Sequence, residues 1–583
     1  MPVFEPDALE ELLWRFRTGR ISRRQFLTAL GTGGVVLAGS AALAACGSSA
    51  PAVTPMPGSK AAGAGATAAP TAATGGGATA PAATTAAGGA GGKDTVVLSL
   101  SSDITSLDPH ANVLRDGIKV FYHLFDNLGV RDYASNRVGQ HLATEWKNTG
   151  DTTWDMTLRD DVKFVNGDKF TANTVKFNIE RVINPATKSP QAGNWQAIDH
   201  IEVHDETHLT WVTKKPYPVF VERLQNLQFL AENVVKEKGD AWVAENCIGT
   251  GPYKLIKYDR GQQIAMERND GYWGPKPAFK YGTFRIIPDI STQIAELLAG
   301  NVDIVPAFPL DQIDALEKSG RGKSFVQPIL RTMFRGMDAR GRSGANPFQD
   351  KAVRLAVNLA CNVKGYANTL EKGGDFTPGC VSPLAFGFDK TVPMYDYDQA
   401  KAKQTLTDAG YKPDQDGVMA KDGKRLEFKL LTGPTTVPNN LQIQQAIVQD
   451  LQAVGIKAEI QNVGDSTAFV STVTSNKTQF YQFDWGYYSV FDADGILWDM
   501  FHSDSPYAYF STPELDKLLE DGRGTLDQQK RLEAYSKAQH LLHDEAAVLF
   551  MFAVHSIWGV SSKVDWQPRS DEIDRLFEAK PKA

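Results

Sequence analysis

The chain has 583 residues and carries 61 Lys and Arg against 68 Asp and Glu, a formal net charge of −7. A nucleic-acid binder normally has a basic excess, so this balance argues against a wide phosphate-binding surface. Four cysteines in this length exclude a disulfide-built scaffold, and no apolar run of about 18 residues beyond the N-terminal region predicts a membrane-spanning body. At about 150 residues per domain, the length predicts three or four domain-sized units.

Residues 1–45 have the composition of an export signal. Arg23 and Arg24 end a basic region, and the residues from Ala29 to Ala45 carry no charge. The arginine pair with the Phe-Leu that follows resembles the twin-arginine export motif, although paired arginines also occur in ordinary secretion signals. Leu-Ala-Ala-Cys at 43–46 resembles a bacterial lipobox, in which the thiol of Cys46 is lipidated. We therefore predict an exported lipoprotein on the outer face of the cytoplasmic membrane, on its periplasmic or extracellular side.

Residues 46–93 are predicted to be the lipidated cysteine and a flexible linker. All but three of the residues 47–92 are Ala, Gly, Thr, Pro or Ser, and none is aromatic or acidic. Such a segment cannot bury enough apolar surface to offset the entropy that it would lose on ordering. As a flexible coil it would span on the order of 35–40 Å root-mean-square. The linker would let a folded body reorient at the membrane surface.

From Asp94 to about residue 285 the sequence has mainly the two-residue period of strands. The predicted strands are 95–100, 154–158, 201–203, 209–212, 254–258 and 263–268. The last two flank a glycine-bearing turn at 259–261 and are predicted to form a hairpin. We expect a β-rich first lobe over 94–285.

Beyond this point strands and helices alternate. The predicted order is strand 284–287, a helix from Asp289 to Gly300, strand 302–305, and later strand 426–431, helix 441–454 and strand 456–463. Crossovers of this kind imply parallel strands with helices on the sheet faces. We predict an α/β protein with a second lobe over 286–545 and a C-terminal segment, 546–583, that returns to the first lobe.

Several sequence blocks resemble the family 5 solute-binding proteins of ABC transporters, which bind oligopeptides, dipeptides and nickel chelates. In chain order they are TSLDPH (105–110), LATEW (142–146), TLRDDVKFVNGD (157–168), TANTV (171–175), GTGPY (249–253), ERNDGYWG (267–274), GNVDI (300–304), PFQD (347–350) and VRLAVN (353–358). Together the blocks cover roughly residues 95–560 in family order.

The resemblance implies a bilobed periplasmic-binding-protein fold with two mixed-sheet lobes, an extra β-rich subdomain and a hinge of two crossover segments. The lobes would trap a di- or oligopeptide and deliver it to the ABC permease and ATPase subunits. The protein would be a monomer with no cofactor, no metal and no catalytic residue. An oligosaccharide, a nickel chelate or another organic solute remains open as the ligand, and an exported enzyme or sensor is the less favoured alternative.

The segment 481–494 combines aromatic and acidic side chains, which suits a binding cleft, although a core strand with a capping turn would have the same composition. In peptide-binding relatives an acidic residue here pairs with the peptide's α-amino group, and the alignment places Ser489 at that position. Arg335, on the predicted strand 332–337, could bind a ligand carboxylate. The predicted ligand-binding residues are Trp485, Tyr487, Tyr488, Ser489, Phe491, Asp492, Asp494, Arg335 and Trp195.

Two further patterns have competing interpretations. His200, His204 and His208 recur every four residues, which would suit a metal site on a helix, but the flanking strands favour a hairpin. Cys361 and Cys380 could form a disulfide in an exported protein, and free buried thiols are the equal alternative. Motifs for phosphate binding, metalloprotease or nucleophile-elbow chemistry are incomplete or missing from the chain.

Overall fold

The computed structural model describes residues 94–582 except 113, 371–374, 377–378, 436, 438 and 487–489. The predicted export signal with Arg23 and Arg24, the lipid site Cys46 and the linker lie outside the described residues. Within the described part of the chain, no helix is long and apolar enough to cross a membrane.

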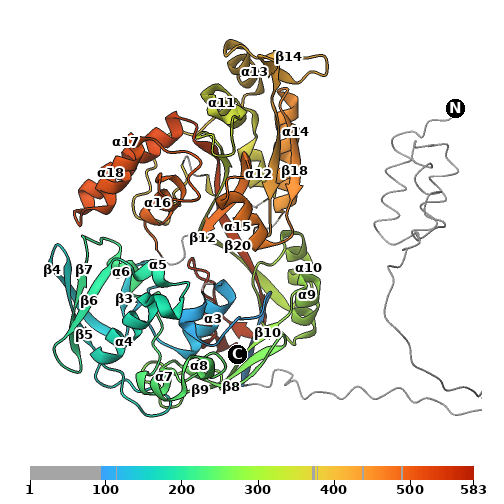
Figure 1. The fold of residues 1–583 in the computed structure, drawn as a ribbon. Coiled ribbons are helices and arrows are strands. Elements are labelled where there is room, and N and C mark those ends of the chain that lie inside the picture. The colour runs from blue at the N-terminus through green and yellow to red at the C-terminus, as the bar shows by residue number, and fades with distance from the viewer. Residues whose placement is uncertain are drawn as a thin grey trace, which may run out of the picture. The chain divides into compact units, whose positions relative to one another are not determined.

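One mixed sheet runs through the body (Figure 1). Its strand order is β18-β17-β19-β12-β20-β11-β1-β10-β9-β8, and β13 pairs with β20 outside this path. The strands are β1 Thr95–Leu100, β8 Tyr253–Asp259, β9 Gln263–Arg268, β10 Tyr281–Ile286, β11 Ile304–Val305, β12 Gly322–Met337, β13 Asp375–Phe376, β17 Glu427–Thr432, β18 Lys457–Asn462, β19 Phe480–Gly486 and β20 Val548–Ser561. The predicted hairpin is confirmed, because β8 and β9 pair antiparallel.

Helix α9 (Ile290–Ala299) connects two strands that lie on either side of β1. Strands β10 and β11 both pair with β1 in parallel, as the strand–helix–strand order predicts. The Asp289 side chain accepts a hydrogen bond of 2.8 Å from the Thr292 amide and so caps the start of the helix. Gly300 ends it with φ of 81°, a conformation in which a side chain would be strained. Both predicted ends of this helix are confirmed.

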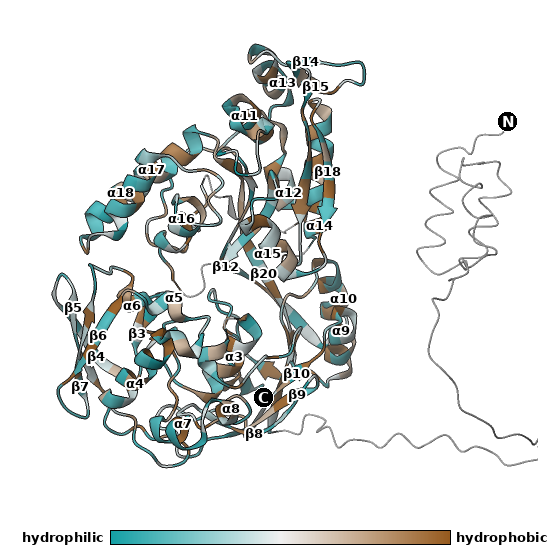
Figure 2. Ribbon diagram, in the orientation of Figure 1, coloured by the Kyte–Doolittle hydropathy of each residue, from teal (hydrophilic) through white to brown (hydrophobic). Residues whose placement is uncertain are grey.

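The second strand–helix–strand unit is also confirmed. Strands β17 and β18 pair in parallel and are joined by α14 (Asn440–Ala453). Helices around this half are α11 Lys351–Ala360, α12 Val363–Leu370, α13 Gln399–Asp408, α15 Ser466–Thr474, α16 Asp494–Phe501, α17 Pro513–Arg523 and α18 Gln528–Asp544, with a small sheet of β14 Lys412–Pro413, β15 Met419–Lys421 and β16 Lys424–Arg425. Figure 2 shows the outer helices α17 and α18 as largely hydrophilic beside a more hydrophobic sheet.

A separate antiparallel sheet forms a β-rich subdomain. Its strand order is β4-β5-β7-β6. Its elements and those beside it are β2 Gly129–Arg131, β3 Val138–Gln140, β4 Ala143–Gly150, β5 Thr153–Leu158, α4 Ala172–Ile183, α5 Ala192–Trp195, β6 Ile198–Val203, β7 His208–Thr213, α6 Phe220–Arg223, α7 Glu232–Lys238 and α8 Asp240–Val243. Trp211 lies at the centre of the subdomain core, with Trp195 stacked 6.0 Å and Phe220 packed edge-on 5.3 Å from its ring.

The remaining elements complete the body. They are α3 Arg115–Leu124, α10 Ile313–Lys318, β21 Val564–Asp565, β22 Lys580–Pro581 and the short 3-10 helices η1 Pro109–Ala111, η2 Pro185–Thr187, η3 Leu310–Gln312, η4 Pro347–Gln349 and η5 Leu576–Glu578. The C-terminal segment packs beside α3, where the amide of Leu576 donates to His123 Nε2 at 2.8 Å.

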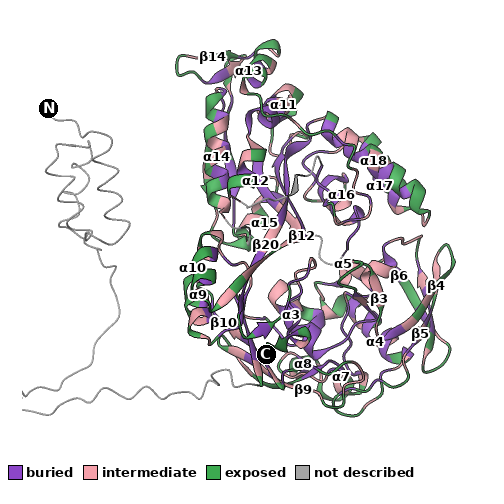
Figure 3. Cartoon of the chain, turned by 180° about the vertical axis from the view of Figure 1, so that it is seen from behind, coloured by how far each residue is buried: buried purple, intermediate pink, exposed green. Residues whose placement is uncertain are grey.

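The long strands β12 and β20 join the two halves of the sheet. The start of β12 pairs with the end of β20, next to β11 and β1, whereas the end of β12 pairs with β19. Their register is interrupted between Pro328 and Thr332, so the pairing is locally irregular where the chain crosses from one half to the other. Strand β20 is largely buried, and β12 is buried from Ile329 to Met337 (Figure 3). We call the β1 half with the β-rich subdomain the first lobe, and the β17–β19 half the second lobe.

Helices α9 and α10 with β11 lie in the first lobe, although the sequence pattern assigns residues from 286 onward to the second. Val97, Leu297, Val302 and Ile557 share one core cluster in this region. The strand–helix–strand pattern is the same in both lobes, so periodicity alone could not locate the crossover, which the structure places at β12.

The three described cysteines, Cys247, Cys361 and Cys380, are free thiols, so no Cys361–Cys380 disulfide is present. Cys361 and Cys380 are buried in different core clusters. Burial raises the pKa of all three thiols far above the ordinary value, and they act as small apolar core residues.

Candidate functional site

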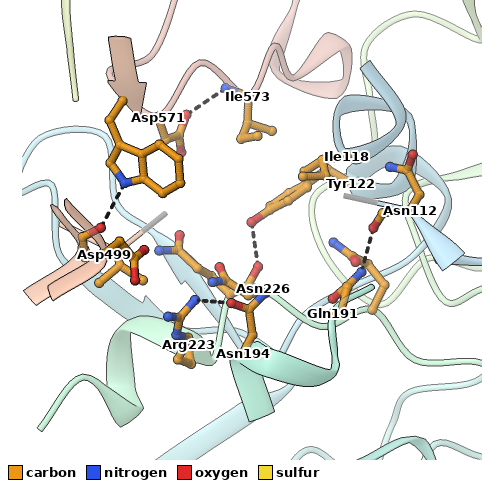
Figure 4. Close-up of a pocket in the computed structure, with 15 residues that line it drawn as sticks. Asn112, Ile118, Tyr122, Gln191, Asn194, Arg223, Asn226, Asp499, Asp571 and Ile573 are labelled. Atoms are coloured by element: carbon orange, nitrogen blue, oxygen red, sulfur yellow. Dashed lines mark hydrogen bonds between the residues drawn. The ribbon is translucent and has the colours of Figure 1, made fainter. Parts of the chain in front are cut away.

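A cavity of about 280 Å³ lies where the two lobes face each other (Figure 4). Four parts of the chain contribute to its wall. These are the α3 region with Asn112, Ile118 and Tyr122, the β-rich subdomain with Gln191, Asn194, Arg223, Gln225, Asn226 and Gln228, the second lobe with Trp485, Val490, Gly495 and Asp499, and the C-terminal segment with Asp571 and Ile573.

The subdomain side of the cavity is formed mainly by carboxamides and one cation. Arg223 ends the short helix α6, whose first residue, Phe220, is anchored in the tryptophan core. The Arg223 guanidinium donates from Nη1 to Asn194 Oδ1 at 3.0 Å and from Nε to Tyr217 Oη at 3.2 Å. These two bonds fix the plane of the guanidinium at the cavity edge, as Figure 4 shows for the bond to Asn194.

Two hydrogen bonds tie this side to the α3 region. Tyr122 Oη donates to the carbonyl of Gln225 at 2.7 Å, and burial raises the pKa of this phenol to about 12. Gln191 Nε2 donates to the carbonyl of Asn112 at 3.0 Å. The wall is therefore preorganised before any ligand enters.

The second-lobe side presents a flat aromatic ring and a carboxylate. Trp485, at the end of β19, donates from Nε1 to the carbonyl of Gly495 at 2.9 Å, which holds the indole against the start of α16. Asp499 lies in the last turn of α16. Its carboxylate has no hydrogen-bond or ion-pair partner among the described residues. Burial, followed by the Asp494 carboxylate, raises the pKa of Asp499 to about 6, while Arg523 and Arg223 oppose the rise.

Of the predicted ligand-binding residues that the structure describes, Trp485 lines the cavity. Asp492 is bound 2.8 Å from Arg531, and Asp494 is bound to Arg523 through two contacts of 2.8 Å. Burial raises the pKa of Asp492 to about 6 against the opposing effect of Arg531. Both acids are thus engaged inside the second lobe, next to the cavity rather than in its wall.

The other predicted residues that the structure describes lie away from the cavity wall. Phe491 is buried under the Arg131 guanidinium, whose carbon lies 3.8 Å from the ring centre, so this contact joins the two lobes. Arg335 is fully buried and donates to Gln444 Oε1 at 3.1 Å. Trp195 is fully buried in the subdomain core beside Asn194. Tyr487, Tyr488 and Ser489 lie outside the described residues.

The C-terminal segment 569–575 connects the cavity to the crossing strands; we call it the strap. Asp571 and Ile573 face the cavity. The residues between and beside them contact the crossing strands and α3. The Ser570 carbonyl accepts from the Leu330 amide at 3.2 Å, Glu572 pairs with Arg115 and Arg331, and Asp574 pairs with Lys119 at 2.6 Å. A turn produces this alternation: the Glu572 amide donates to the Arg569 carbonyl at 3.0 Å, and Glu572 has a φ of 56°.

Arg331 joins the strap to the second lobe. Its Nη2 lies 3.6 Å from Glu572, and its Nη1 lies 2.7 Å from Asp484 on β19. Burial acts to raise the pKa of Glu572, but Arg115, Arg331 and Lys119 together hold this pKa below its usual value. The strap therefore carries an ion-pair link between the lobes directly behind the cavity.

The histidines considered for a metal site lie on the β6–β7 hairpin. His200 bonds to Asp199 at 2.8 Å, His204 to Thr210 at 2.8 Å and His208 to Asp205 at 2.8 Å. The described part of the chain contains no group of three or more side chains arranged to hold a metal ion.

Comparison with known proteins assigns the family. The model of the bacterial extracellular solute-binding proteins, family 5 Middle, matches residues 137–507. The probable D,D-dipeptide-binding periplasmic protein DdpA of Escherichia coli is 27% identical over 483 residues, which cover 79% of this chain and 88% of that protein.

Solved structures agree on the fold. NikA from Brucella suis in complex with Fe(III)-EDTA superposes with a TM-score of 0.75 at 24% identity, over 84% of this chain and 100% of NikA. The oligopeptide-binding protein AppA from Bacillus subtilis, in complex with a nonapeptide, superposes with a TM-score of 0.70 at 22% identity, over 84% of this chain and 99% of AppA. The fold is thus the bilobed periplasmic-binding-protein fold, and the chain belongs to family 5 of the bacterial extracellular solute-binding proteins, the substrate-binding proteins of ABC importers.

Proposed function

We propose that this protein captures a peptide in the cavity between its lobes and delivers it, unmodified, to the permease and ATPase subunits of an ABC importer. The observation that carries this proposal is the position of the cavity. Its wall comes from both lobes, and the strap behind it also contacts the crossing strands. A ligand here would contact both lobes at once and so favour the closed arrangement by its additional contacts.

The chemistry of the wall supports a peptide. Carboxamides supply donors and acceptors for peptide groups, and Trp485 supplies a flat apolar face. One cation, Arg223, and one carboxylate without a partner among the described residues, Asp499, supply charge. Among the residues expected from the sequence, Trp485 is our proposed ligand contact, and Tyr487, Tyr488 and Ser489 stay predicted contacts. The names of the relatives DdpA and AppA, which are dipeptide- and oligopeptide-binding proteins, favour the same ligand class.

The test is recovery of a ligand and of its chemical form. The purified full chain is analysed by native mass spectrometry, and the released ligand is identified after denaturation. Recovery of intact peptide, and unchanged peptide after prolonged incubation with the protein, would support the proposal. Recovery of an oligosaccharide or a nickel chelate would contradict the peptide assignment, and hydrolysis of added peptide would contradict a purely receptor role.

We also propose that the mature protein is a lipoprotein anchored through Cys46. The lipobox-like sequence at 43–46 supports this assignment. Replacement of Cys46 by Ala is expected to move the protein from the membrane fraction to the soluble extracytoplasmic fraction, whereas Cys247→Ala, which removes a core thiol, leaves it at the membrane. Retention of the Cys46→Ala protein at the membrane would contradict lipid anchoring. Replacing Arg23 and Arg24 together by Lys tests the twin-arginine route, because that substitution blocks export only if the route depends on the arginine pair.

A further inference from the structure

We propose that Arg131, which lies outside the cavity wall, is a positioning residue that fixes both sides of the cavity when the lobes meet. Its guanidinium holds Phe491 of the second lobe, next to the wall residue Val490. It also holds Glu222 of the first lobe, next to the wall residue Arg223. This inference rests on the proposed function, since it concerns the closure of the lobes around a ligand in the same cavity.

Arg131 is held firmly on the side of the first lobe. It ends β2, and its side chain is 1% exposed. Nη1 donates to the carbonyl of Asn136 at 2.5 Å, and Nη2 pairs with Glu222 on α6. The Arg131 carbonyl accepts a hydrogen bond from Arg569 in the strap. Because a guanidinium is a planar fork of donors, these contacts to three separate segments fix the plane in which it lies.

Phe491 is held as firmly by the second lobe. It belongs to the core cluster of that lobe, and its carbonyl accepts from the Phe386 amide at 2.9 Å. The next residue, Asp492, is bound to Arg531. The Arg131 guanidinium carbon lies 3.8 Å from the centre of the Phe491 ring, and Phe491 is 4% exposed. Since each partner is fixed to its own lobe, the two can be in contact only while the lobes are together.

The contact connects the two walls of the cavity. Val490, directly before Phe491, lines the cavity from the second lobe, and Arg223, directly after Glu222, lines it from the first. Arg131 contacts the neighbours of both wall residues. A ligand that touches both walls therefore favours the same arrangement of the lobes as Arg131 does. Removing the contact should weaken ligand binding, although Arg131 is not part of the wall.

The contact can be weakened without changing its shape. The negative face of an aromatic ring attracts a cation, and the attraction is stronger where water is excluded, as it is around Arg131. Fluorine atoms on the ring withdraw electron density from this face but add little volume. Graded fluorination of Phe491 therefore reduces the attraction to Arg131 and leaves the ring in its core position.

The experiment measures peptide binding by full chains that carry 4-fluoro-, 3,5-difluoro- or 3,4,5-trifluorophenylalanine at position 491. The probe is a casein hydrolysate, and its apparent affinity is measured by tryptophan fluorescence, since Trp485 lines the cavity. The same series is repeated in Arg131→Gln protein. The matched control is the trifluoro ring at position 334. Phe334 lies in the same core cluster, stacked 5.6 Å from Phe483, and among the described residues no cation lies over its ring.

With Arg131 present, the apparent affinity should fall stepwise with the number of fluorine atoms, to about 3- to 30-fold below that of the unmodified protein for the trifluoro ring. Arg131→Gln should lose at least as much affinity. Fluorination should then have no further effect, because the cation that the ring attracts is gone. The control at position 334 should bind the hydrolysate as the unmodified protein does.

Two results would overturn the inference and leave the peptide function intact. They are an unchanged affinity across the fluorine series, and an equal loss with and without Arg131, which would show that the ring acts by packing alone. The fluorine series keeps Arg131 in place, so the inference stays testable even if Arg131→Gln does not fold.

If the wild type binds no peptide, the peptide function itself is wrong. X-ray scattering of the same proteins without peptide then decides whether Arg131 holds the lobes together. A radius of gyration that rises with fluorination of Phe491 supports this role, and an unchanged radius contradicts it.

Discussion

The two ends of helix α16 differ in what their carboxylates do. At its start, Asp492 and Asp494 are bound to Arg531 and Arg523. At its other end, one turn and a half further, Asp499 lines the cavity with no such partner among the described residues. All three are acidic residues of one short segment, so composition does not separate them. An acid paired within its own lobe neutralises a buried cation, whereas an acid left unpaired at a cavity is available to a ligand.

The largest expected effect comes from breaking the buried pair. Asp492→Ala leaves the Arg531 guanidinium buried without its counter-charge and should lower the free energy of unfolding by about 3–5 kcal/mol, measured by urea denaturation. The double variant Asp492→Leu with Arg531→Met removes both charges and should recover most of this loss. If Asp492→Ala is as stable as the wild type, then Asp492 is not needed to neutralise Arg531 in the folded protein.

The second largest loss of stability is expected for Glu572, whose carboxylate takes part in the ion-pair link between the lobes. Glu572→Gln removes the charge between Arg115 and Arg331 and should cost about 1.5–3 kcal/mol of unfolding free energy. Because the link connects the strap to the second lobe, the ligand-free variant should also have a larger radius of gyration in X-ray scattering. Asp565→Asn, in the nearby C-terminal region but exposed, is the control. An unchanged scattering profile would show that Arg331–Glu572 does not hold the lobes together.

Removing the charge of Asp499 is expected to raise the free energy of unfolding, whereas the two preceding substitutions lower it. The folded pKa of Asp499, about 6, lies above the ordinary value of 3.8, so the folded state binds this proton more tightly than the unfolded state does. The group therefore destabilises the empty protein above pH 6, and this effect fades as the pH falls from 6 towards 4. Asp499→Asn should raise the unfolding free energy at pH 7.5 by about 1–3 kcal/mol.

The check for Asp499 is a pair of stability curves against pH. The difference between Asp499→Asn and the wild type should shrink between pH 7 and pH 4. The charged and titratable groups around Asp499 are Asp494 on its own helix, Arg523 on α17, Arg223 on α6 and Tyr507, whose pKa is raised by burial and by Asp499. Since Asp494 is bound to Arg523 in both proteins, a constant difference across this range would contradict the assignment of the pKa near 6 to Asp499.

The smallest expected loss of stability is at the ion pair between Asp494 and Arg523, which is partly exposed. The Arg523 side chain is 35% exposed, so water screens its contact with Asp494. Asp494→Asn should lower the unfolding free energy by about 1 kcal/mol or less. Lys517→Ala, which removes an exposed i,i+4 partner on the same helix as Arg523, should have no measurable effect. If Asp494→Asn lost as much unfolding free energy as Asp492→Ala, the greater exposure of the Asp494–Arg523 pair would not make that pair weaker than Asp492–Arg531.

Local patterns predicted the elements that depend on neighbouring residues. The Asp289 cap and Gly300 stop of α9, the β8–β9 hairpin and both strand–helix–strand units follow from side-chain periodicity and turn chemistry within short stretches of sequence. The aromatic and acidic composition of 481–494 also singled out Trp485, which lines the cavity. No such signal marked Arg223, Asn226 or Asp499, because a single polar residue at or just beyond the end of a helix is common on any protein surface.

The sequence by itself determined an α/β body with a leader-like N-terminus, its family and most of its regular elements, because these depend on local periodicity and on motifs in a fixed order. Only the tertiary structure decided which charged side chains are paired within the protein and which remain available to a ligand. Arg531 and Asp492 are 39 positions apart, and Arg223 and Asp499 are far more distant in the chain, so only folding establishes that the first two neutralise each other and that the last two face a common cavity. A charge that is neutralised by a neighbouring side chain is not available to a ligand, and which side chains are neighbours depends on their distance in the folded structure.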